Sequence, residues 1–292
     1  MPPSTNPQTC LVTGAGGYLG SRVAAWLEQH GWRVVRLTRR PEAGAAAIRF
    51  QLGEPVPPAV LAGAAALVHC AYDFDARAWP DIHAINVLGS ERLFAAAREA
   101  KIGKLVYISS ISAFPGCRAL YGKAKLETEK VASRFGATIL RPGLIYGCSP
   151  GGMFGRLVRQ VEQSRLLPLF NGGRQPQYLL HEQDLSAVIG RCAAGALEGL
   201  AEPLTIAHEQ PWTFRALLEA IARAKRRRVH FVPVPWRLAW AGLKCAEACR
   251  VPLSFRSDSL VSLIHQNPHP SFAAQRNLGI SCRSFRLELS GG

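Results

Sequence analysis

The chain has 292 residues and a formal net charge of +15, and 48% of its residues are hydrophobic and 19% charged. This balance excludes an intrinsically disordered chain and allows one large α/β domain or two ordinary ones. The eight cysteines lack the paired short spacings of metal sites and disulfide frameworks, so we expect no metal. Residues 1–8 lack a basic stretch followed by an apolar run, which favours a loose tail over a signal peptide and predicts a cytoplasmic protein.

The positive charge favours anionic partners such as phosphates, acyl-thioester carriers or nucleic acid. The densest basic run, Lys225–Arg228, lies beside an expected helix end without interleaved aromatic residues, which favours a solvated surface over a nucleic-acid site. Charged residues interrupt the apolar stretch Trp236–Leu253, so it predicts an amphipathic helix and not a membrane span. We expect a small-molecule substrate, which the charge favours to be anionic, and neither a nucleic-acid nor a membrane partner.

The N-terminal part of the chain shows the alternation of a βαβ unit. A short apolar strand, Thr9–Thr13, stops at a glycine cluster, and helical spacing follows over Ser21–His30. Gly31 ends this helix, and Arg33–Thr38 supplies a second strand rich in β-branched residues. The alternation continues with expected strands at Ile48–Leu52, Ala65–Cys70, Lys104–Ser109 and Ala137–Arg141, and expected helices at Ile82–Ala100 and Leu120–Phe135. This order predicts an α/β fold with a doubly wound parallel sheet of the Rossmann type.

After Arg141 the spacing of apolar residues becomes irregular, which predicts a small mixed C-terminal lobe. We therefore expect an NAD(P)-binding Rossmann domain over residues 9–190 and a substrate-binding lobe over 191–292, to which 147–175 contribute. The expected elements of this part are helices at Phe154–Ser164, Thr213–Ala224 and Trp236–Leu253 and a strand at Val229–Val232.

A glycine-rich turn, TGAGGYLG at residues 13–20, joins the first strand to the first helix. Glycines at such a position let a pyrophosphate approach backbone amides and the N-terminus of the helix. The flanking strand and helix make this signal much more specific than a glycine cluster alone. The dinucleotide-binding residues predicted here are Gly14, Gly16, Gly17, Tyr18, Leu19 and Gly20.

The end of the second strand indicates which dinucleotide fits. An acidic side chain there would accept hydrogen bonds from the ribose 2′-hydroxyl of NAD, but the residues are Thr38, Arg39 and Arg40, and the next carboxylate along the chain is Glu42. Two guanidinium groups suit a 2′-phosphate. We therefore expect NADP, with NAD as the weaker alternative; a merely solubilising role for these arginines stays open.

Tyr121 and Lys125 lie four residues apart at the start of an expected helix, and so on one face of it. A phenol titrates near ~10 in water, but a nearby ammonium favours its phenolate. Tyr121 can then exchange a proton with a substrate near neutral pH. A Tyr and a Lys at this spacing are more often exposed surface residues without a catalytic role. The upstream glycine turn favours the catalytic interpretation here.

Three hydroxyl groups, those of Ser109, Ser110 and Ser112, follow an expected buried strand. Open α/β sheets bind ligands at the carboxyl ends of their strands. A serine there can hydrogen-bond the substrate oxygen whose charge changes as hydride moves. For any one of the three, capping of the next turn is an equally good explanation.

These motifs together resemble the extended short-chain dehydrogenases and the NAD(P)-dependent epimerase/dehydratases, over roughly residues 10–185. The marks of the resemblance, in chain order, are TGAGGYLG at 13–20, HCA at 69–71, NVLG at 86–89, YISS at 107–110, YGKAK at 121–125, RPGLIYG at 141–147 and HEQDL at 181–185.

The resemblance implies further site residues. In the dihydroflavonol and cinnamoyl-CoA reductase branch the second serine of the serine segment is catalytic, which implies Ser110, and Arg39 resembles that branch's 2′-phosphate-binding arginine. Many epimerases instead use the third position, which is Ile111 here, and a basic residue where this chain has Gln177. The cofactor-binding residues implied or predicted beyond the glycine turn are Thr38, Arg39, Arg40, His69, Cys70, Ala71, Asn86, Ser109, Tyr121, Lys125, Pro142, Gly143 and Leu144.

Three functions follow from this pattern. The leading one is an NADP(H)-dependent oxidoreductase in which Ser110, Tyr121 and Lys125 exchange hydride and proton with a secondary alcohol or carbonyl. The second is an NAD(P)-dependent nucleotide-sugar epimerase or dehydratase, and the third is a non-catalytic NADP-binding sensor or assembly protein. By analogy with the family, the helices at Ile82–Ala100 and Leu120–Phe135 are the candidates for a homodimer interface.

Overall fold

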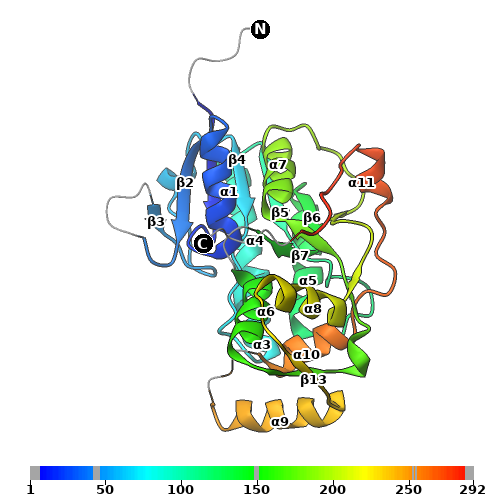
Figure 1. The fold of residues 1–292 in the computed structure, drawn as a ribbon. Coiled ribbons are helices and arrows are strands. Elements are labelled where there is room, and N and C mark those ends of the chain that lie inside the picture. Colours follow the sequence, from blue (N-terminus) through cyan, green and yellow to red (C-terminus); the bar gives the residue numbers. More distant parts are fainter. Residues whose placement is uncertain (1–6, 42–46, 148–150, 252, 254, 287–292) are drawn as a thin grey trace. The chain divides into compact units, whose positions relative to one another are not determined.

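The computed structural model describes residues 7–41, 47–147, 151–251, 253 and 255–286, and its centre is a sheet of seven strands (Figure 1). The strand order is β11-β6-β5-β4-β1-β2-β3, and the ladders from β3 to β6 are parallel. The strands are β1 (Thr9–Thr13), β2 (Arg33–Thr38), β3 (Ala47–Arg49), β4 (Ala66–His69), β5 (Lys104–Ile108), β6 (Thr138–Pro142) and β11 (Leu204–Ile206). The order reverses beside β1, which is the switch point where such sheets bind ligands.

Helices cover both faces of this sheet, which confirms the predicted doubly wound fold. On one face α1 packs against α7, where the Trp26 ring lies so close to Gly190 that a β-carbon would clash. On the other face α2, α4 and α5 pack on the strands. Their bounds are α1 (Tyr18–Gln29), α2 (Pro58–Leu61), α3 (Trp79–Ile82), α4 (Gly89–Glu99), α5 (Leu120–Arg134) and α7 (Glu182–Ala193).

The chain divides into two compact units whose segments alternate along the sequence. Unit 1 comprises Met1–Ser110, Ala124–Arg141 and Glu182–Leu204, and unit 2 comprises Ile111–Lys123, Pro142–His181 and Thr205–Gly292. The helix α5 therefore begins in unit 2 and ends in unit 1. Because the segments interleave, short stretches such as 111–123 belong with the C-terminal part of the chain.

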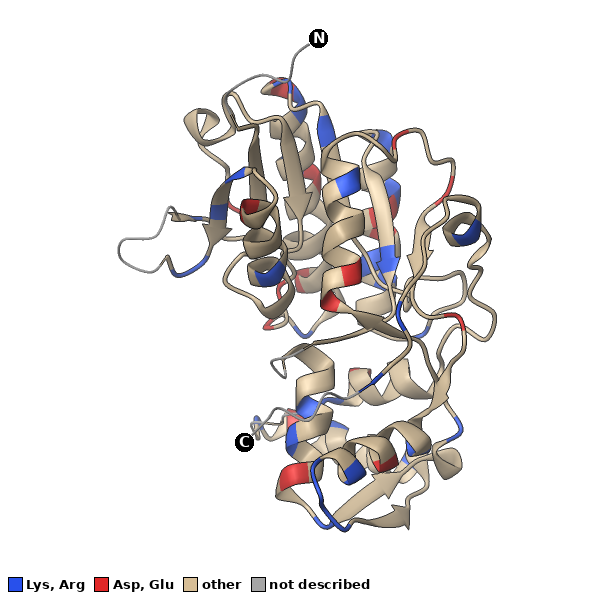
Figure 2. Cartoon of the chain, turned by 45° about the horizontal axis from the view of Figure 1, so that its top comes forward, with Lys and Arg blue, Asp and Glu red and all other residues tan. Residues whose placement is uncertain are grey.

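Basic side chains are distributed over both units, as the blue segments of Figure 2 show. Some are paired with carboxylates at the surface, as Arg36 is with Glu28 at 2.7 Å and Arg134 with Glu91 at 2.7 Å. Exposed pairs of this kind contribute about 0–1 kcal/mol each. These surface pairs therefore contribute little to the stability of the fold.

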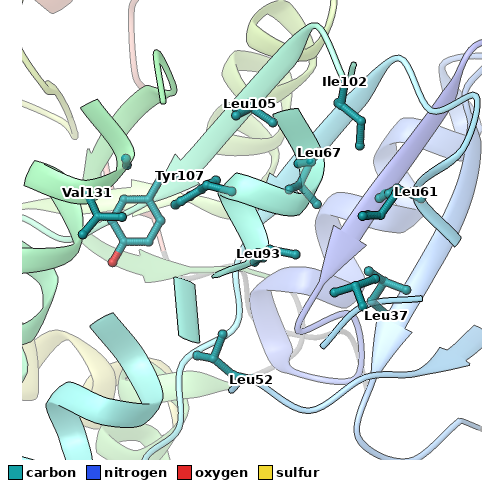
Figure 3. Packing of buried hydrophobic residues seen from close by; sticks show 14 of the residues in the cluster. Leu37, Leu52, Leu61, Leu67, Leu93, Ile102, Leu105, Tyr107 and Val131 are labelled. Atoms are coloured by element: carbon teal, nitrogen blue, oxygen red, sulfur yellow. The ribbon is translucent and has the colours of Figure 1, made fainter. Parts of the chain in front are cut away.

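The core of unit 1 lies between the sheet and α2, α4 and α5 (Figure 3). Leu67 and Tyr107 come from the strands, Leu93 from α4 and Val131 from α5, and all are at least nine-tenths buried. Burial of a large apolar side chain stabilises a fold by about 1.5–3 kcal/mol. This core fixes the strand ends that carry the candidate site.

Two expected elements differ in the structure. The helix expected at Ile82–Ala100 is α3 followed by a π-helix, η1 (His83–Leu88), and then α4. The strand expected at Ile48–Leu52 is β3, which starts one residue earlier and ends at Arg49. The apolar residues that follow β3 are buried in the core without extending the ladder.

Unit 2 is a mixed lobe of short strand pairs and helices, as predicted. Its core contains Tyr146, Phe154, Leu217 and Phe285. Within the described ranges, no helix is long and apolar enough to cross a membrane. Its elements are β7 (Leu144–Tyr146), α6 (Gly152–Gln163), β8 (Leu166–Leu169), the 3-10 helix η2 (Asn171–Gly173), β9 (Pro176–Gln177), β10 (Leu179–His181), β12 (Trp212–Thr213), α8 (Phe214–Ala224), β13 (His230–Pro233), α9 (Trp236–Ala248), α10 (Ser257–Ile264) and α11 (Ala273–Asn277).

Candidate functional site

The glycine turn after β1 forms a cradle that only glycine fits. Gly14 has φ +67°, and a β-carbon there would lie 2.9 Å from the Ala71 backbone, while one at Gly20 would collide with the Gly14 carbonyl. Gly17 is the N-cap of α1, and in the described chain no side chain caps this end and no acidic residue occupies its first turn. Uncapped amides at a helix N-terminus form an anion site. The predicted residues Gly14 to Gly20 are therefore brought together in one tight turn at the N-terminus of α1.

The end of β2 lies beside this turn. The Thr38 side chain fills the space that a β-carbon at Gly16 would need. Arg39 is exposed, and its Nη1 lies 3.0 Å from Asp75 Oδ2 and 3.5 Å from Asp73 Oδ2. The carboxylates close to Arg39 therefore come from the loop after β4 and not from the end of β2.

A buried hydrogen-bond chain crosses the ends of β1 and β4. Thr13 Oγ1 lies 2.7 Å from His69 Nδ1, His69 Nε2 lies 2.9 Å from Ser90 Oγ, and Ser90 Oγ donates to the Asn86 carbonyl at 2.5 Å. Because Ser90 donates its hydroxyl proton to the Asn86 carbonyl, its oxygen accepts a hydrogen bond from His69 Nε2–H. His69 Nδ1 then accepts a hydrogen bond from the Thr13 hydroxyl. The Ala71 amide donates to Thr13 Oγ1 at 3.2 Å. His69 is thus fixed as one neutral tautomer, and the network orients the Ala71 backbone.

Burial and, to a smaller extent, the nearby positive charge of Lys125 together lower the pKa of His69 to about 3. In the unfolded chain the imidazole of His69 has a pKa near 6.5. Between pH 3 and pH 6.5 the unfolded chain therefore binds more protons than the folded chain, so the stability of the fold decreases as the pH decreases. We expect the unfolding free energy of the wild type, relative to His69→Gln, to decrease by about 1.4 kcal/mol per pH unit from pH 6 to pH 4. Denaturant titrations at each pH measure it, and parallel curves would contradict a buried neutral His69.

The predicted cofactor residue Asn86 holds the loop that follows β4. Its Oδ1 accepts from the Asp73 amide at 2.7 Å, and its Nδ2 donates to the Asp73 carbonyl at 3.2 Å. Asp73 Oδ1 in turn accepts from the amides of Asp75 and Ala76 at 2.9 and 3.0 Å. Asn86 lies within the π-helix, a local widening that often occurs at functional sites. The loop carrying the two Arg39 partners is therefore fixed in place.

Lys125 reaches the carboxyl end of β5 from α5. Its Nζ donates to the Ile108 carbonyl at 2.7 Å and lies 4.9 Å from the ring centre of Tyr107 and 5.2 Å from that of Tyr72. Burial lowers the pKa of Lys125 to about 8, while burial raises that of the neighbouring Cys70 to about 12. An ammonium of this kind is predominantly charged at neutral pH and gives up its proton more readily than an exposed lysine.

Ser109 and Ser110, at the end of β5, have different surroundings. Ser109 Oγ donates to Glu129 Oε1 at 2.5 Å, and Arg141 binds the same buried carboxylate through Nε at 2.8 Å and Nη2 at 2.5 Å. The Ser109 hydroxyl is thus engaged in the core, which favours a positioning role over the predicted cofactor contact. Ser110 follows β5 and is half-buried.

Tyr121 lies in the first turn of α5, and a residue far away in the sequence caps that turn. Asp258 of α10 accepts hydrogen bonds from the Leu120 amide at 2.7 Å and the Tyr121 amide at 3.1 Å. The preceding Ala119 has no side-chain acceptor with which to cap the helix. This role of Asp258 was missed by sequence reasoning, and the lack of a capping residue at position 119 was the one available signal.

Removal of this cap tests whether it positions Tyr121. We expect Asp258→Ala to lower the unfolding free energy by about 1 kcal/mol and to reduce kcat, and Asp258→Asn to restore much of both. Thr213→Ala is the matched control, since the Thr213 hydroxyl caps α8 by accepting from the Ala216 amide at 3.1 Å. Thermal unfolding and steady-state kinetics measure both quantities. An equal fall in kcat for the Thr213 variant would contradict the positioning role.

The predicted residues Pro142 to Leu144 lie in unit 2, where the chain passes from β6 to β7. The Gly143 amide donates to Ile206 at 3.0 Å and the Leu144 amide to Tyr178 at 2.7 Å. A β-carbon at Gly143 would collide with the Tyr178 carbonyl. This segment is therefore held rigidly by its backbone.

A parallel sheet with a glycine turn at its switch point is typical of dinucleotide-binding proteins. A sequence profile of the NAD dependent epimerase/dehydratase family matches residues 10–196. The chain belongs to this family, which confirms the predicted resemblance and that the protein is an NAD(P)-dependent enzyme.

Three curated relatives are similar to the chain. A 4-hydroxy-2-methyl-3-oxo-4-farnesyl-3,4-dihydroquinoline-1-oxide ketoreductase from Stigmatella aurantiaca is 27% identical over 56% of this chain and 58% of its own length. A 2-alkyl-3-oxoalkanoate reductase from Stenotrophomonas maltophilia is 30% identical over 56% and 59%. A ceramide reductase from Caulobacter vibrioides is 26% identical over 77% and 73%. The matches to the first two thus span somewhat over half of those relatives.

Solved structures share the fold at lower identity. A UDP-N-acetylglucosamine 4-epimerase from Bacillus cereus has a TM-score of 0.65 at 19% identity, covering 88% of this chain and 98% of its own. A dTDP-glucose 4,6-dehydratase from Streptomyces venezuelae with NAD bound has 0.64 at 19%, covering 77% and 84%. A dTDP-4-dehydrorhamnose reductase from Bacillus anthracis in complex with NADP has 0.64 at 16%, covering 80% and 86%.

Proposed function

We propose that the protein is an NADP(H)-dependent ketoreductase whose substrate carries a long apolar chain. The observation that carries the proposal is Lys125, a buried lysine with a lowered pKa, held at the carboxyl end of β5 four residues after Tyr121 on one helix. Perturbed lysines of this kind are typical of catalytic sites. The substrate class is supported by the three curated relatives, whose names describe reductases acting on farnesyl, alkyl or ceramide compounds.

The residues present fit a dinucleotide. The uncapped first turn of α1 offers backbone amides that suit a pyrophosphate, and the glycines at 14, 16 and 20 let the turn pack closely against the rest of the chain, where any β-carbon would clash. NADPH, when bound, supplies the hydride. The chain's own residues bind it, orient the substrate carbonyl and supply the proton.

In this mechanism the Tyr121 phenol donates its proton to the carbonyl oxygen as hydride adds to the carbonyl carbon, so the ketone becomes a secondary alcohol. The ammonium of Lys125, one helical turn away, favours the phenolate that remains. Ser110 polarises the carbonyl by a hydrogen bond. Asp258 acts through the backbone of Tyr121, and Glu129 acts through Ser109 and Arg141.

A sugar-nucleotide reaction is less well supported. At the position where many epimerases carry a basic residue, this chain has Gln177, which is buried and donates its side-chain amide to the Pro176 carbonyl at 3.0 Å. A neutral amide held in this way provides no cation for a diphosphate.

Chain-length dependence tests the substrate class. With NADPH and a series of 2-alkyl-3-oxoalkanoates, we expect kcat/KM to rise with each added methylene, because burial of each contributes about 0.8 kcal/mol. Steady-state NADPH oxidation measures this. Turnover that is independent of chain length, or isomerisation of a UDP-sugar without NADPH consumption, would contradict the proposal.

Arg39 is the residue that we propose selects NADP. Its ion pair with Asp75 is exposed, so a 2′-phosphate displaces it at little cost. We expect Arg39→Ala to weaken NADP+ binding about tenfold or more while NAD+ binding changes little, since a charge-assisted hydrogen bond is worth about 1.5–3 kcal/mol. Asp75→Asn, the matched control, removes the nearer of the two carboxylates beside Arg39 and should tighten NADP+ binding. Calorimetric titrations of the three proteins with NADP+ and with NAD+ measure these affinities, and a preference for NAD+ in the wild type would contradict the assignment.

A further inference from the structure

The helix α9 (Trp236–Ala248) exposes an apolar face. None of its residues is buried, Leu238 is 69% exposed, and Ala241, Cys245 and Ala248 are exposed as well. The spacing of these four residues places them on one stripe of the helix. The opposite side contacts α10, where the Trp236 ring lies 5.5 Å from His265 and Glu247 accepts from the Ser257 amide at 2.8 Å.

The exposed charges on and beside this helix are positive. Arg237 and Lys244 lie on one side of the apolar stripe, with Lys244 Nζ 3.7 Å from Glu247 Oε2, and Arg250 follows the helix. The helix has one acidic residue, Glu247, and it is turned toward Ser257 of α10. Arg237 lies 5.8 Å from the Trp236 ring centre, and Lys244 lies 6.0 Å from that of Trp240. An exposed apolar stripe bordered by cations is typical of helices that lie in a membrane interface.

The strand pair β8 and β13, which leads into α9, is also apolar outside. Leu166 is 60% exposed and Val232 is 40% exposed, while the alternate residues Leu167 and Leu169 are buried in the core of unit 2. The parallel register pairs Leu166 with His230 and Pro168 with Val232. Unit 2 therefore exposes apolar side chains on this strand pair as well as on α9.

A cationic cavity of about 520 Å³ lies at the start of β13. Its lining is basic throughout: Arg165, Arg226, Arg227, Arg228 and His230. Across the described ranges, none of these arginines has a carboxylate within 4.0 Å, whereas the neighbouring Lys225 pairs with Glu162 at 2.8 Å. The basic run follows α8 as a blue stretch in Figure 2. Like charges gathered without acidic partners attract a polyanion.

We propose that these three features of unit 2, called here the docking surface, bind an anionic lipid bilayer. The docking surface comprises the outer face of α9, the outer row of β8 and β13, and the cluster Arg165, Arg226, Arg227, Arg228 and His230. A bilayer complements both parts of this surface, because it offers an apolar interior for Leu238 and Leu166 and anionic headgroups for the arginines.

Charge distinguishes this occupant from the alternatives. A second copy of the chain would bring the same unpaired arginines against themselves, and like-charge juxtaposition disfavours such an interface. Nucleic acid would satisfy the arginines but would leave the apolar stripe of α9 in water. The surface is also tied to the proposed site, because Glu247 of α9 binds the start of α10, and Asp258 of α10 caps the helix that carries Tyr121.

Vesicle sedimentation with the full chain tests the docking surface. We expect the protein to sediment with phosphatidylcholine vesicles that contain phosphatidylglycerol and to stay in solution with phosphatidylcholine alone. Leu238→Glu, and separately the triple change of Arg226, Arg227 and Arg228 to Ala, should each weaken binding at least tenfold. Met153→Glu, an exposed apolar residue of α6, and the triple change of Lys101, Lys130 and Arg134 to Ala are the matched controls and should bind as the wild type does.

Several results would overturn the proposal. One is the absence of binding to the anionic vesicles, and another is an equal loss of binding in the control variants. A third is a dimer in sedimentation velocity that Leu238→Glu dissociates, because it would identify the face as a contact between copies of the chain. Tight binding of duplex DNA that the triple arginine change abolishes while vesicle binding is unaffected would also overturn it. Because no turnover is measured, failure here is distinguishable from failure of the proposed ketoreductase function.

Discussion

Replacement of Tyr121 by Phe is expected to lower kcat by about 10²–10⁴-fold, the usual contribution of a positioned general acid. The change removes one oxygen atom and leaves the ring, so α5 and its cap at Asp258 should persist. Dinucleotide affinity should change little, because the proposed cradle is built from the backbone of residues 14–20. Steady-state kinetics with NADPH and a 2-alkyl-3-oxoalkanoate measure the first effect, and calorimetry measures the second.

Tyr146→Phe provides the matched control for this change. It removes the same oxygen from a buried tyrosine of unit 2, whose hydroxyl donates to the Ser284 carbonyl at 3.3 Å. This variant should lose some stability and keep its kcat. If Tyr121→Phe retained kcat within about threefold of the wild type, or if both variants lost the same activity, Tyr121 would not be the proton donor.

The second large effect is expected at Glu129, which neutralises Arg141 inside unit 1. The Glu129 side chain is 5% exposed and that of Arg141 is 20% exposed. Loss of one partner of a buried ion pair costs about 3–5 kcal/mol because the other charge is left without compensation. We expect Glu129→Leu to lower the unfolding free energy by about 3 kcal/mol, at the low end because Arg141 can reach some water.

A double-mutant cycle tests the cause of this loss. Replacement of both partners, Glu129→Leu with Arg141→Met, should recover most of the stability, since apolar replacements of a buried pair are often close to neutral. Chemical denaturation of the four proteins measures the coupling. Additive losses in the double variant would show that the two side chains do not act as a pair, and that Ser109 alone depends on Glu129.

The sequence predicts the first half of the fold well because glycines mark where its elements end. The strands β1 and β2 have the predicted bounds, since a glycine turn follows one and Gly31 precedes the other. The helix predicted at Ile82–Ala100 was wrong in kind over His83–Leu88. Apolar spacing did not distinguish this turn from an α-helix, because a π-helix differs by its backbone i→i+5 hydrogen bonds.

The candidate site could be predicted only where its residues are near in sequence. The glycine turn and the pair of Tyr121 and Lys125 follow from local spacing. Asp258 binds α5 residues that lie 137 and 138 positions before it, and Asp75 binds Arg39, which lies 36 positions before it. The periodicity of a sequence does not reveal contacts at such separations. The burial of Ser109 against Glu129 likewise depends on which face of β5 the helix α5 covers.

The amphipathic character of Trp236–Leu253 is another partial success. Apolar spacing predicts a stripe, and α9 has one, but spacing is the same whether a stripe faces the core or the solvent. Leu238 and Cys245 face outward because Trp236 and Glu247 take the contacts with α10. The expectation of no membrane partner rests on the inability of this segment to span a bilayer, whereas a helix that lies on the surface of a bilayer has the same amphipathic pattern.

The most direct test of the central proposal is transfer of label from cofactor to substrate. With NADPH deuterated at the hydride-donating position and a 2-alkyl-3-oxoalkanoate, the mechanism predicts a secondary alcohol with one deuterium at the former carbonyl carbon for each NADPH oxidised. The reaction should be strongly slowed in Tyr121→Phe. Absence of deuterium from the product, together with isomerisation of a UDP-sugar and no net oxidation of the cofactor, would contradict the ketoreductase assignment and favour an epimerase.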